Sequence, residues 1–165
     1  MWKATEIPED WRAFVELLNS NEIEYLIVGA VAVAYHGFPR YTGDLDILIH
    51  NTPENAQRLE ASIQAFGLGS LGLKAADFTE PYQVVQIGVR PERIDILTAI
   101  SGVSFEEAWA SRVEDKLAGV PASFIGREAL AKNKRSIRRP QDRADLERLE
   151  RVNQADADAG SENQS

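Results

Sequence analysis

Two aspartates separated by a single residue have the spacing of a metal-binding pair. Asp44 and Asp46 lie in the alternating segment Asp44-Leu-Asp-Ile-Leu-Ile49, which predicts a β-strand. Side chains two residues apart on a strand face the same side, so both carboxylates project from one face while Leu45 and Ile47 point into the core. The two carboxylates repel each other unless a cation lies between them. For a bare Asp-x-Asp, two solvated acids at the start of a strand are the more common explanation.

A third aspartate strengthens the metal-site interpretation. Asp95 lies in the apolar segment Arg93-Ile-Asp-Ile-Leu-Thr98, which predicts another strand, where an uncompensated charge is unfavourable. If this strand lies beside the Asp44 strand, three carboxylates converge as oxygen ligands for Mg²⁺ or Mn²⁺ ions that bind a triphosphate. The chain has no cysteine and only two histidines, which disfavours thiolate and histidine-rich zinc sites. The alternative places Asp95 on the surface of an edge strand.

A glycine at the end of a strand forms a candidate anion site. The apolar run Tyr25-Leu-Ile-Val28 predicts a buried strand, and Gly29 and Ala30 follow it at the start of a predicted helix that reaches His36. Backbone N–H groups at a helix start bind anions such as triphosphate oxygens. Strand-glycine-helix turns are also common for packing reasons alone, and that interpretation stays open here.

The other segments predict an α/β (α+β) fold with a mixed central sheet flanked by helices and a C-terminal helical pair. Helices are predicted over residues 8–20, 53–66, 104–109, 127–135 and 141–151. Hairpins are predicted between strands 82–89 and 93–100 and between strands 112–117 and 122–125. We expect residues 1–151 to form one domain and residues 152–165 to form a disordered acidic tail.

Charge and hydropathy limit the partners of the chain. The 165 residues carry a net charge of −8, which argues against broad, non-specific binding to nucleic acid, although residues 127–143 form a local basic segment. No apolar run approaches the roughly 20 residues that span a bilayer. The N-terminus also lacks the apolar stretch of a signal peptide. We therefore expect a cytoplasmic protein that does not contact a membrane.

Together, these segments resemble the nucleotidyltransferase superfamily related to DNA polymerase β. The resemblance covers roughly residues 23–150 and rests on Tyr25-Leu-Ile-Val-Gly-Ala30, Thr42-Gly-Asp-Leu-Asp-Ile47, Arg93-Ile-Asp-Ile96, and the C-terminal segments Leu130-Ala-Lys-Asn-Lys134, Arg138-Arg-Pro-Gln-Asp142 and Asp145-Leu146. The stretch from Gly29 to Asp46 looks like the minimal bacterial and archaeal branch, which includes nucleotidyltransferases of abortive-infection and toxin–antitoxin systems. Two positions depart from the branch: Ala30 replaces a second Gly or Ser, and Gln141 replaces a frequent Lys.

The resemblance implies a magnesium-dependent enzyme that transfers a nucleoside monophosphate from an NTP to a hydroxyl group of an RNA, a protein or a small molecule. Asp44, Asp46 and Asp95 would be both the catalytic residues and the ligands of Mg²⁺ (or Mn²⁺). The implied nucleotide-binding residues are Gly29, Ala30, Arg40, Thr42, Lys134 and Arg139. For the basic residues, solvated helix faces are the competing interpretation, and Arg40 and Thr42 would equally brace their loop.

The branch also implies a toxin-type role with a small partner protein. Two alternatives stay open on the sequence alone. One is a catalytically degenerate module that binds a nucleotide or RNA, which Ala30 favours and the retained aspartates oppose. The other is the interaction partner in a toxin–antitoxin pair, which is compatible with activity.

Overall fold

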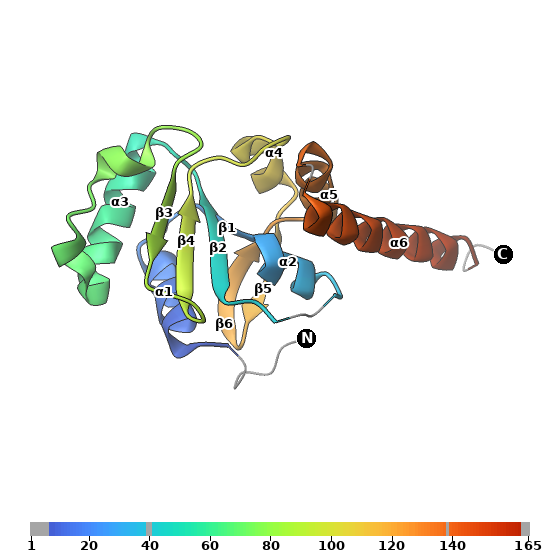
Figure 1. The fold of residues 1–165 in the computed structure, drawn as a ribbon, viewed down its shortest axis with the longest axis horizontal. Coiled ribbons are helices and arrows are strands. Elements are labelled where there is room, and N and C mark those ends of the chain that lie inside the picture. Colours follow the sequence, from blue (N-terminus) through green and yellow to red (C-terminus); the bar gives the residue numbers. More distant parts are fainter. Residues whose placement is uncertain (1–6, 39–40, 138, 163–165) are drawn as a thin grey trace.

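One six-stranded mixed sheet organises the fold, as the sequence predicts. The computed structural model describes residues 7–38, 41–137 and 139–162, with residues 152–162 as backbone only. The strand order is β3–β4–β2–β1–β6–β5, and Figure 1 shows the helices around it. At the centre, β1 (Tyr25–Val28) is antiparallel to β2 (Asp44–Ile49), and β2 is parallel to β4 (Arg93–Leu97).

Both predicted hairpins are confirmed and form the two sides of the sheet. On one side, β3 (Val84–Ile87) pairs with β4 in antiparallel orientation. On the other side, β5 (Val113–Leu117) pairs with β6 (Val120–Phe124), also antiparallel. The second hairpin joins the centre because β6 runs parallel to β1, with Ile27 opposite Phe124. The two hairpins therefore enclose the β1–β2 pair.

Alternating side chains divide the apolar residues between the two faces of the sheet. Leu45 and Ile47 belong to one buried cluster, with α1 (Glu9–Ser20), α3 (Pro53–Ile63) and short helical turns over residues 64–78. Leu48 belongs to a second cluster on the other face, with α2 (Gly29–Tyr35), α4 (Phe105–Ala110) and α5 (Arg127–Ser136). Asp44 and Asp46 share the face of Leu48 because strand side chains alternate.

The last helix is longer than the sequence pattern predicts. The apolar periodicity ends near Arg151, whereas α6 runs from Pro140 to Glu162 and extends away from the sheet (Figure 1). Alanines at 155, 157 and 159 have high helix propensity, which favours this extension. The division into a 1–151 domain and a 152–165 tail stays a prediction. Among the helices of the described residues, none has the length and hydropathy to cross a membrane.

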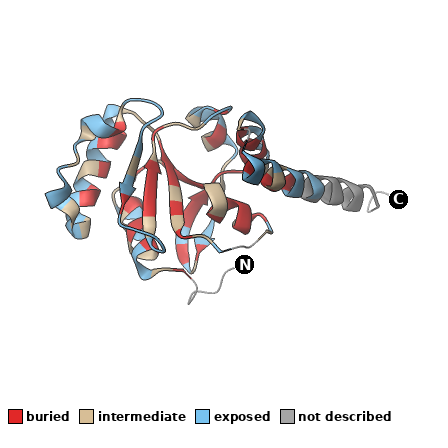
Figure 2. Ribbon diagram, in the orientation of Figure 1, coloured by how far each residue is buried: buried red, intermediate tan, exposed pale blue. Residues whose placement is uncertain are grey.

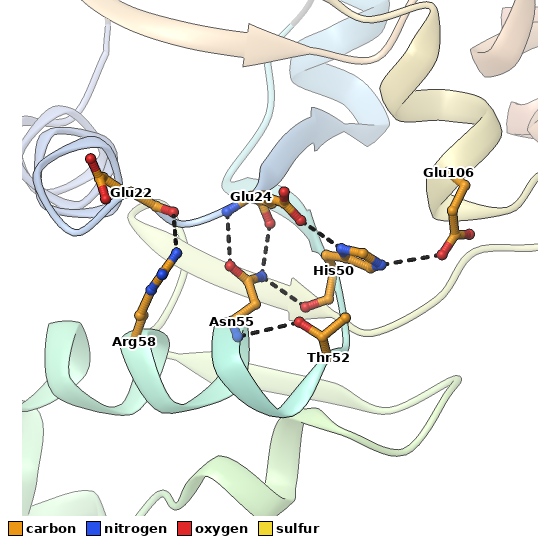
Figure 3. Close-up of polar contacts among 7 residues, drawn as sticks. All are labelled: Glu22, Glu24, His50, Thr52, Asn55, Arg58 and Glu106. Atoms are coloured by element: carbon orange, nitrogen blue, oxygen red, sulfur yellow. Dashed lines mark hydrogen bonds and ion pairs between the residues drawn. The ribbon is translucent and has the colours of Figure 1, made fainter.

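A polar cluster fixes the end of β2 farthest from the aspartates. The Nδ1 atom of His50 lies 2.6 Å from a carboxylate oxygen of Glu24, and its Nε2 atom lies 3.2 Å from a carboxylate oxygen of Glu106 in α4. The imidazole also stacks on Phe105, with 4.5 Å between ring centroids. Asn55 of α3 accepts from the backbone N–H of Glu24 and donates to the carbonyls of Glu24 and His50. Figure 3 shows that these contacts join β1, β2, α3 and α4 at one point.

Candidate active site

The parallel pairing of β2 and β4 brings the three aspartates together. Asp46 lies opposite Asp95 in the register, and Asp44 projects from the same face two residues earlier. One carboxylate oxygen from each residue lies within 4.8 Å of the other two. Asp95 is buried with 6% of its surface exposed, while Asp44 and Asp46 are half-buried. The adjacency of the two strands, on which the metal-site interpretation depends, is present in the structure.

The carboxylate cluster has the chemistry of a hard-cation site. All of its donors are oxygens, which suit Mg²⁺ or Mn²⁺. Opposite ligands of one Mg²⁺ ion lie about 4.2 Å apart, since each Mg–O bond is about 2.1 Å. Small side-chain rotations therefore suffice for shared ligation by these carboxylates. The three aspartates fit a bound Mg²⁺ or Mn²⁺ ion.

Gly29 allows the backbone to turn directly against this cluster. Val28, the last residue of β1, lies opposite Asp46. Gly29 then adopts φ +66°, in the left-handed region that favours glycine, and a Cβ atom at this position would collide with the Asp46 carboxylate. The glycine is therefore required by both its conformation and its proximity to the acid.

Arg93 provides a positive charge within the cluster. Its Nε atom donates to one Asp95 oxygen at 2.8 Å, and its terminal nitrogen donates to the other at 3.1 Å. The same terminal nitrogen donates to Asp44 at 3.0 Å. Arg90 lies farther out, with 3.6 Å between its guanidinium and an Asp44 oxygen. One guanidinium thus bridges Asp44 and Asp95, and Arg93 makes no hydrogen bond to Asp46.

The electrostatics of Asp46 reflect this uneven distribution of charge. Burial, together with the negative charges of Asp44 and Asp95, raises the pKa of Asp46 to about 7, against the opposing effects of Lys134 and Arg93. The protein's own cations therefore leave part of the negative charge uncompensated. A bound divalent cation would supply the missing compensation.

The three aspartates line a cleft of about 410 Å³ whose two ends differ in character. The charged end is lined by Gly29, Asp44, Asp46, Asp95, Arg90, Arg93, Lys134 and Arg139. The apolar end lies beyond Asp95 along β3 and β4 and is lined mainly by Tyr82, Val84, Leu97, Ala99 and Ile100. Ser101, Asn133 and Ile137 also line the cleft. The cleft therefore places acids, cations and an apolar surface within reach of a single ligand.

Comparisons with known proteins identify the fold that carries this cleft. No protein-family model and no curated protein sequence matches the chain. Among solved structures, the chain is similar to a Thermotoga maritima protein described as a "putative nucleotidyltransferase". The match covers 94% of this chain and 91% of the other, with a TM-score of 0.50 and 12% sequence identity. The chain shares the fold of that protein. The resemblance inferred from the sequence is confirmed at the level of the fold.

In this fold, Lys134 of α5 is held beside the acids by two buried carboxylates. Its ammonium donates to Asp142 at 2.7 Å and lies 3.4 Å from an Asp145 oxygen. All three side chains are at least 93% buried. Arg139 also donates to Asp142, at 2.6 Å, but its own side chain is 73% exposed. Burial opposes ionisation of Asp142, yet the hydrogen bonds from Lys134 and Arg139 hold its pKa below the usual value.

The other residues expected at the nucleotide have different positions. Thr42 donates its hydroxyl to an Asp44 carboxylate oxygen at 3.1 Å, so it contacts the cluster through that residue. Ala30 follows Gly29 but does not line the cleft. Arg40 lies outside the described residues. Gln141, one of the two departures from the branch, donates its side-chain amide to Asp145 at 3.1 Å.

Arg93 is the cluster residue that the sequence interpretation did not select. The sequence could have predicted it, because Arg93 precedes Asp95 by two positions on the same strand and therefore shares its face. Arg90 had no comparable signal, since it lies in the turn of the β3–β4 hairpin. The apolar end of the cleft was also missed. It is assembled from residues of β3 and β4 and from the residues that flank these strands, which only the folded chain brings together.

Proposed function

We propose that the protein is a Mg²⁺-dependent nucleotidyltransferase that transfers a nucleoside monophosphate from an NTP to a hydroxyl acceptor. The convergence of Asp44, Asp46 and Asp95 within 4.8 Å is the observation that carries this proposal. The same cleft contains Lys134 and Arg139, whose positive charges suit a polyphosphate. The acceptor belongs to one of three classes: an RNA, a protein side chain or a small molecule.

In the proposed reaction, the acceptor oxygen forms a bond to the α-phosphorus of the NTP. The bond from the α-phosphorus to the oxygen that bridges to the β-phosphorus breaks, and pyrophosphate leaves. Bound Mg²⁺ (or Mn²⁺) supplies charge stabilisation at the phosphates and acidifies the attacking hydroxyl. Asp44 and Asp46 hold the metal ions. Asp95 completes their ligand set and helps to accept the proton of the acceptor hydroxyl.

The proposed nucleotide contacts follow from the positions of the remaining residues. Lys134 presents a fixed positive charge to the phosphates because Asp142 and Asp145 hold its ammonium in place. Arg139 lines the same cleft and is 73% exposed although it donates to Asp142, so it suits the outer phosphates. The full set proposed for the nucleotide, Gly29, Ala30, Arg40, Thr42, Lys134 and Arg139, rests for Ala30, Arg40 and Thr42 on the resemblance to the minimal branch.

Label transfer tests this function. The purified protein is incubated with each of the four α-labelled NTPs, Mg²⁺ and either total RNA or a cell lysate. We expect label to appear on one acceptor class with one preferred NTP, together with pyrophosphate release. Asp46→Asn serves as the matched control and should transfer no label. Absence of both label transfer and pyrophosphate release for every NTP would contradict the proposal.

Arg93 favours one second candidate, a module that binds nucleotides without catalysis. Its guanidinium makes hydrogen bonds to Asp44 and Asp95 and partly neutralises the proposed metal ligands. Such a module would bind an NTP equally well with EDTA and with Mg²⁺, and would release no pyrophosphate. Strictly Mg²⁺-dependent binding would exclude it.

We further propose a toxin-type role with a small partner protein and a cytoplasmic location, on the basis of the resemblance to the minimal branch. Expression of the parent alone should arrest growth of a bacterial host, whereas Asp46→Asn should not. Co-expression of the neighbouring small open reading frame should restore growth and yield a complex on purification. Normal growth with the active parent would contradict the toxin-type role.

A further inference from the structure

We infer that the apolar end of the cleft binds the nucleobase of the NTP, and that Tyr82 is the ring on which the base stacks. This inference rests on the proposed function and names the part of the substrate that determines nucleotide affinity. It is carried by three features of the structure: the exposure of Tyr82, the way its backbone is held, and its offset from the aspartates.

Tyr82 and Val84 are exposed apolar side chains inside the cleft. Their exposed fractions are 67% and 55%, whereas the large apolar residues of the neighbouring strand β4 are mostly buried. Figure 2 shows this contrast between β3 at the edge of the sheet and the buried strands beside it. An exposed tyrosine next to an exposed valine offers a flat apolar surface of the kind on which bases stack.

The backbone presents the Tyr82 ring in a fixed way. Tyr82 adopts φ +59°, a left-handed conformation that is unusual for a bulky residue. The following residue, Gln83, is pinned to β4: its N–H donates to the Thr98 hydroxyl at 2.8 Å, and its carbonyl accepts from the Thr98 N–H at 3.1 Å. Thr98 itself is 3% exposed. A strained residue held by a buried partner is typical of ligand-binding positions.

The register places this ring at a suitable offset from the metal ligands. Gln86 lies opposite Asp95, and Val84 lies opposite Leu97. Each two-residue step along a strand spans about 7 Å, so Val84 lies about 7 Å along the sheet from the Asp95 level. Tyr82 lies beyond Val84, in the turn that precedes β3, next to Gln83, which pairs with Thr98. This separation leaves room for a ribose between an α-phosphate at the aspartates and a base at Tyr82.

The opposite wall supports one continuous ligand in preference to two separate ones. Ile137 lines the cleft together with Lys134 and Arg139, between which it lies in the chain. Phosphate-binding and apolar contacts therefore alternate on one short segment. An amphiphilic ligand with a polyphosphate at one end and a planar ring at the other matches this wall, and an NTP has that form.

Comparison of two ligands tests the inference. Isothermal titration calorimetry in Mg²⁺ measures the affinities of α,β-methylene-ATP, which resists transfer, and of inorganic tripolyphosphate, which lacks the base and ribose. Tyr82→Ala should weaken binding of the nucleotide about 10-fold, in line with the loss of one base–aromatic stack. Its affinity for tripolyphosphate should equal that of the parent. Tyr82→Phe should retain nucleotide binding, as should Tyr41→Ala, a control tyrosine that is 84% exposed and does not line the cleft.

The outcomes separate this inference from the proposed function. The base-stacking role would be overturned if Tyr82→Ala lost affinity for both ligands equally, or lost affinity for neither. Parent protein that binds tripolyphosphate as tightly as the nucleotide would also overturn it, while leaving the polyphosphate site of the proposed function intact. Parent protein that binds neither ligand would overturn both.

Discussion

At the scale of single residues, the site is defined by negative charge that the chain compensates only in part. Arg93 neutralises Asp44 and Asp95 through three hydrogen bonds, whereas Asp46 keeps a pKa raised to about 7 by burial and by its two acidic neighbours. A divalent cation and Arg93 therefore serve the same carboxylates. Metal binding must weaken some of the arginine contacts, because a carboxylate oxygen that ligates Mg²⁺ is less available as an acceptor.

A first prediction concerns Asp46 and pH. Because the folded-state pKa lies above the ordinary value, the folded protein binds more protons than the unfolded chain between about pH 4 and pH 7. This contribution to stability is present at low pH and is lost as the pH rises through 7. In EDTA, the Tm of the parent should therefore decrease from pH 5 to pH 8, and the Tm of Asp46→Asn should decrease less. Thermal melts at both pH values measure the difference, and identical pH dependence in parent and variant would contradict it.

A second prediction concerns the competition between Arg93 and metal. Arg93→Gln removes the cation from the cluster, so the metal-free protein should have a lower Tm because three carboxylates then repel one another. Its affinity for Mn²⁺, measured by electron paramagnetic resonance without nucleotide, should rise several-fold. Arg112→Gln is the matched control, since it breaks an arginine–carboxylate pair with Glu114 away from the cleft. Weaker Mn²⁺ binding in Arg93→Gln would instead show that the guanidinium positions the ligands.

At the scale of elements, local patterns predicted most strands and helices, but not their spatial order. Alternating apolar residues predicted β2, and turn residues predicted the two hairpins. Ser104 was predicted to cap α4, and in the structure it accepts from the N–H of Glu107 at 3.1 Å. The pairing of β2 with β4 joins segments about 50 residues apart, for which the sequence carries no pairing signal. Asp95 could therefore be proposed as a ligand only conditionally, and the apolar end of the cleft could not be proposed at all.

A third prediction concerns the junction of α5 and α6. The resemblance to the minimal branch implies that Lys134 contacts the nucleotide. The structure also makes Lys134 the partner of two buried acids. Lys134→Met leaves Asp142 and Asp145 without their ammonium, so it should cost about 3–5 kcal/mol of unfolding free energy, typical of a broken buried pair. Urea denaturation measures this loss. The double variant Lys134→Met/Asp142→Asn should recover part of it, and full stability of the single variant would contradict the pairing.

At the scale of the whole molecule, a net charge of −8 surrounds a cleft with its own local cations. Such a protein attracts Mg²⁺ but repels a free polyphosphate at long range, so binding of the NTP as its magnesium complex is favoured. The composition predicted weak non-specific binding to nucleic acid, and the cleft explains how an anionic ligand still binds. Nucleotide and acceptor choice depend on side chains from distant segments, which the sequence could not place relative to one another.

A fourth prediction links ligand binding to global stability. Mg²⁺–NTP binds the folded protein and not the unfolded chain, so at 100 times its Kd it should add about 2.7 kcal/mol to the unfolding free energy. Asp46→Asn should be at least as stable as the parent without ligand, since it relieves repulsion, but should gain little from Mg²⁺–NTP.

His50→Ala provides the complementary control: it breaks the contacts to Glu24 and Glu106 at the far end of β2. It should lower the baseline Tm but keep the full ligand-induced increase. Thermal melts of the three proteins with and without Mg²⁺–NTP measure both quantities. An equal ligand-induced increase in Asp46→Asn and the parent would contradict the assignment of Asp46 as a metal ligand, because a carboxylate outside the site has no share in the binding free energy.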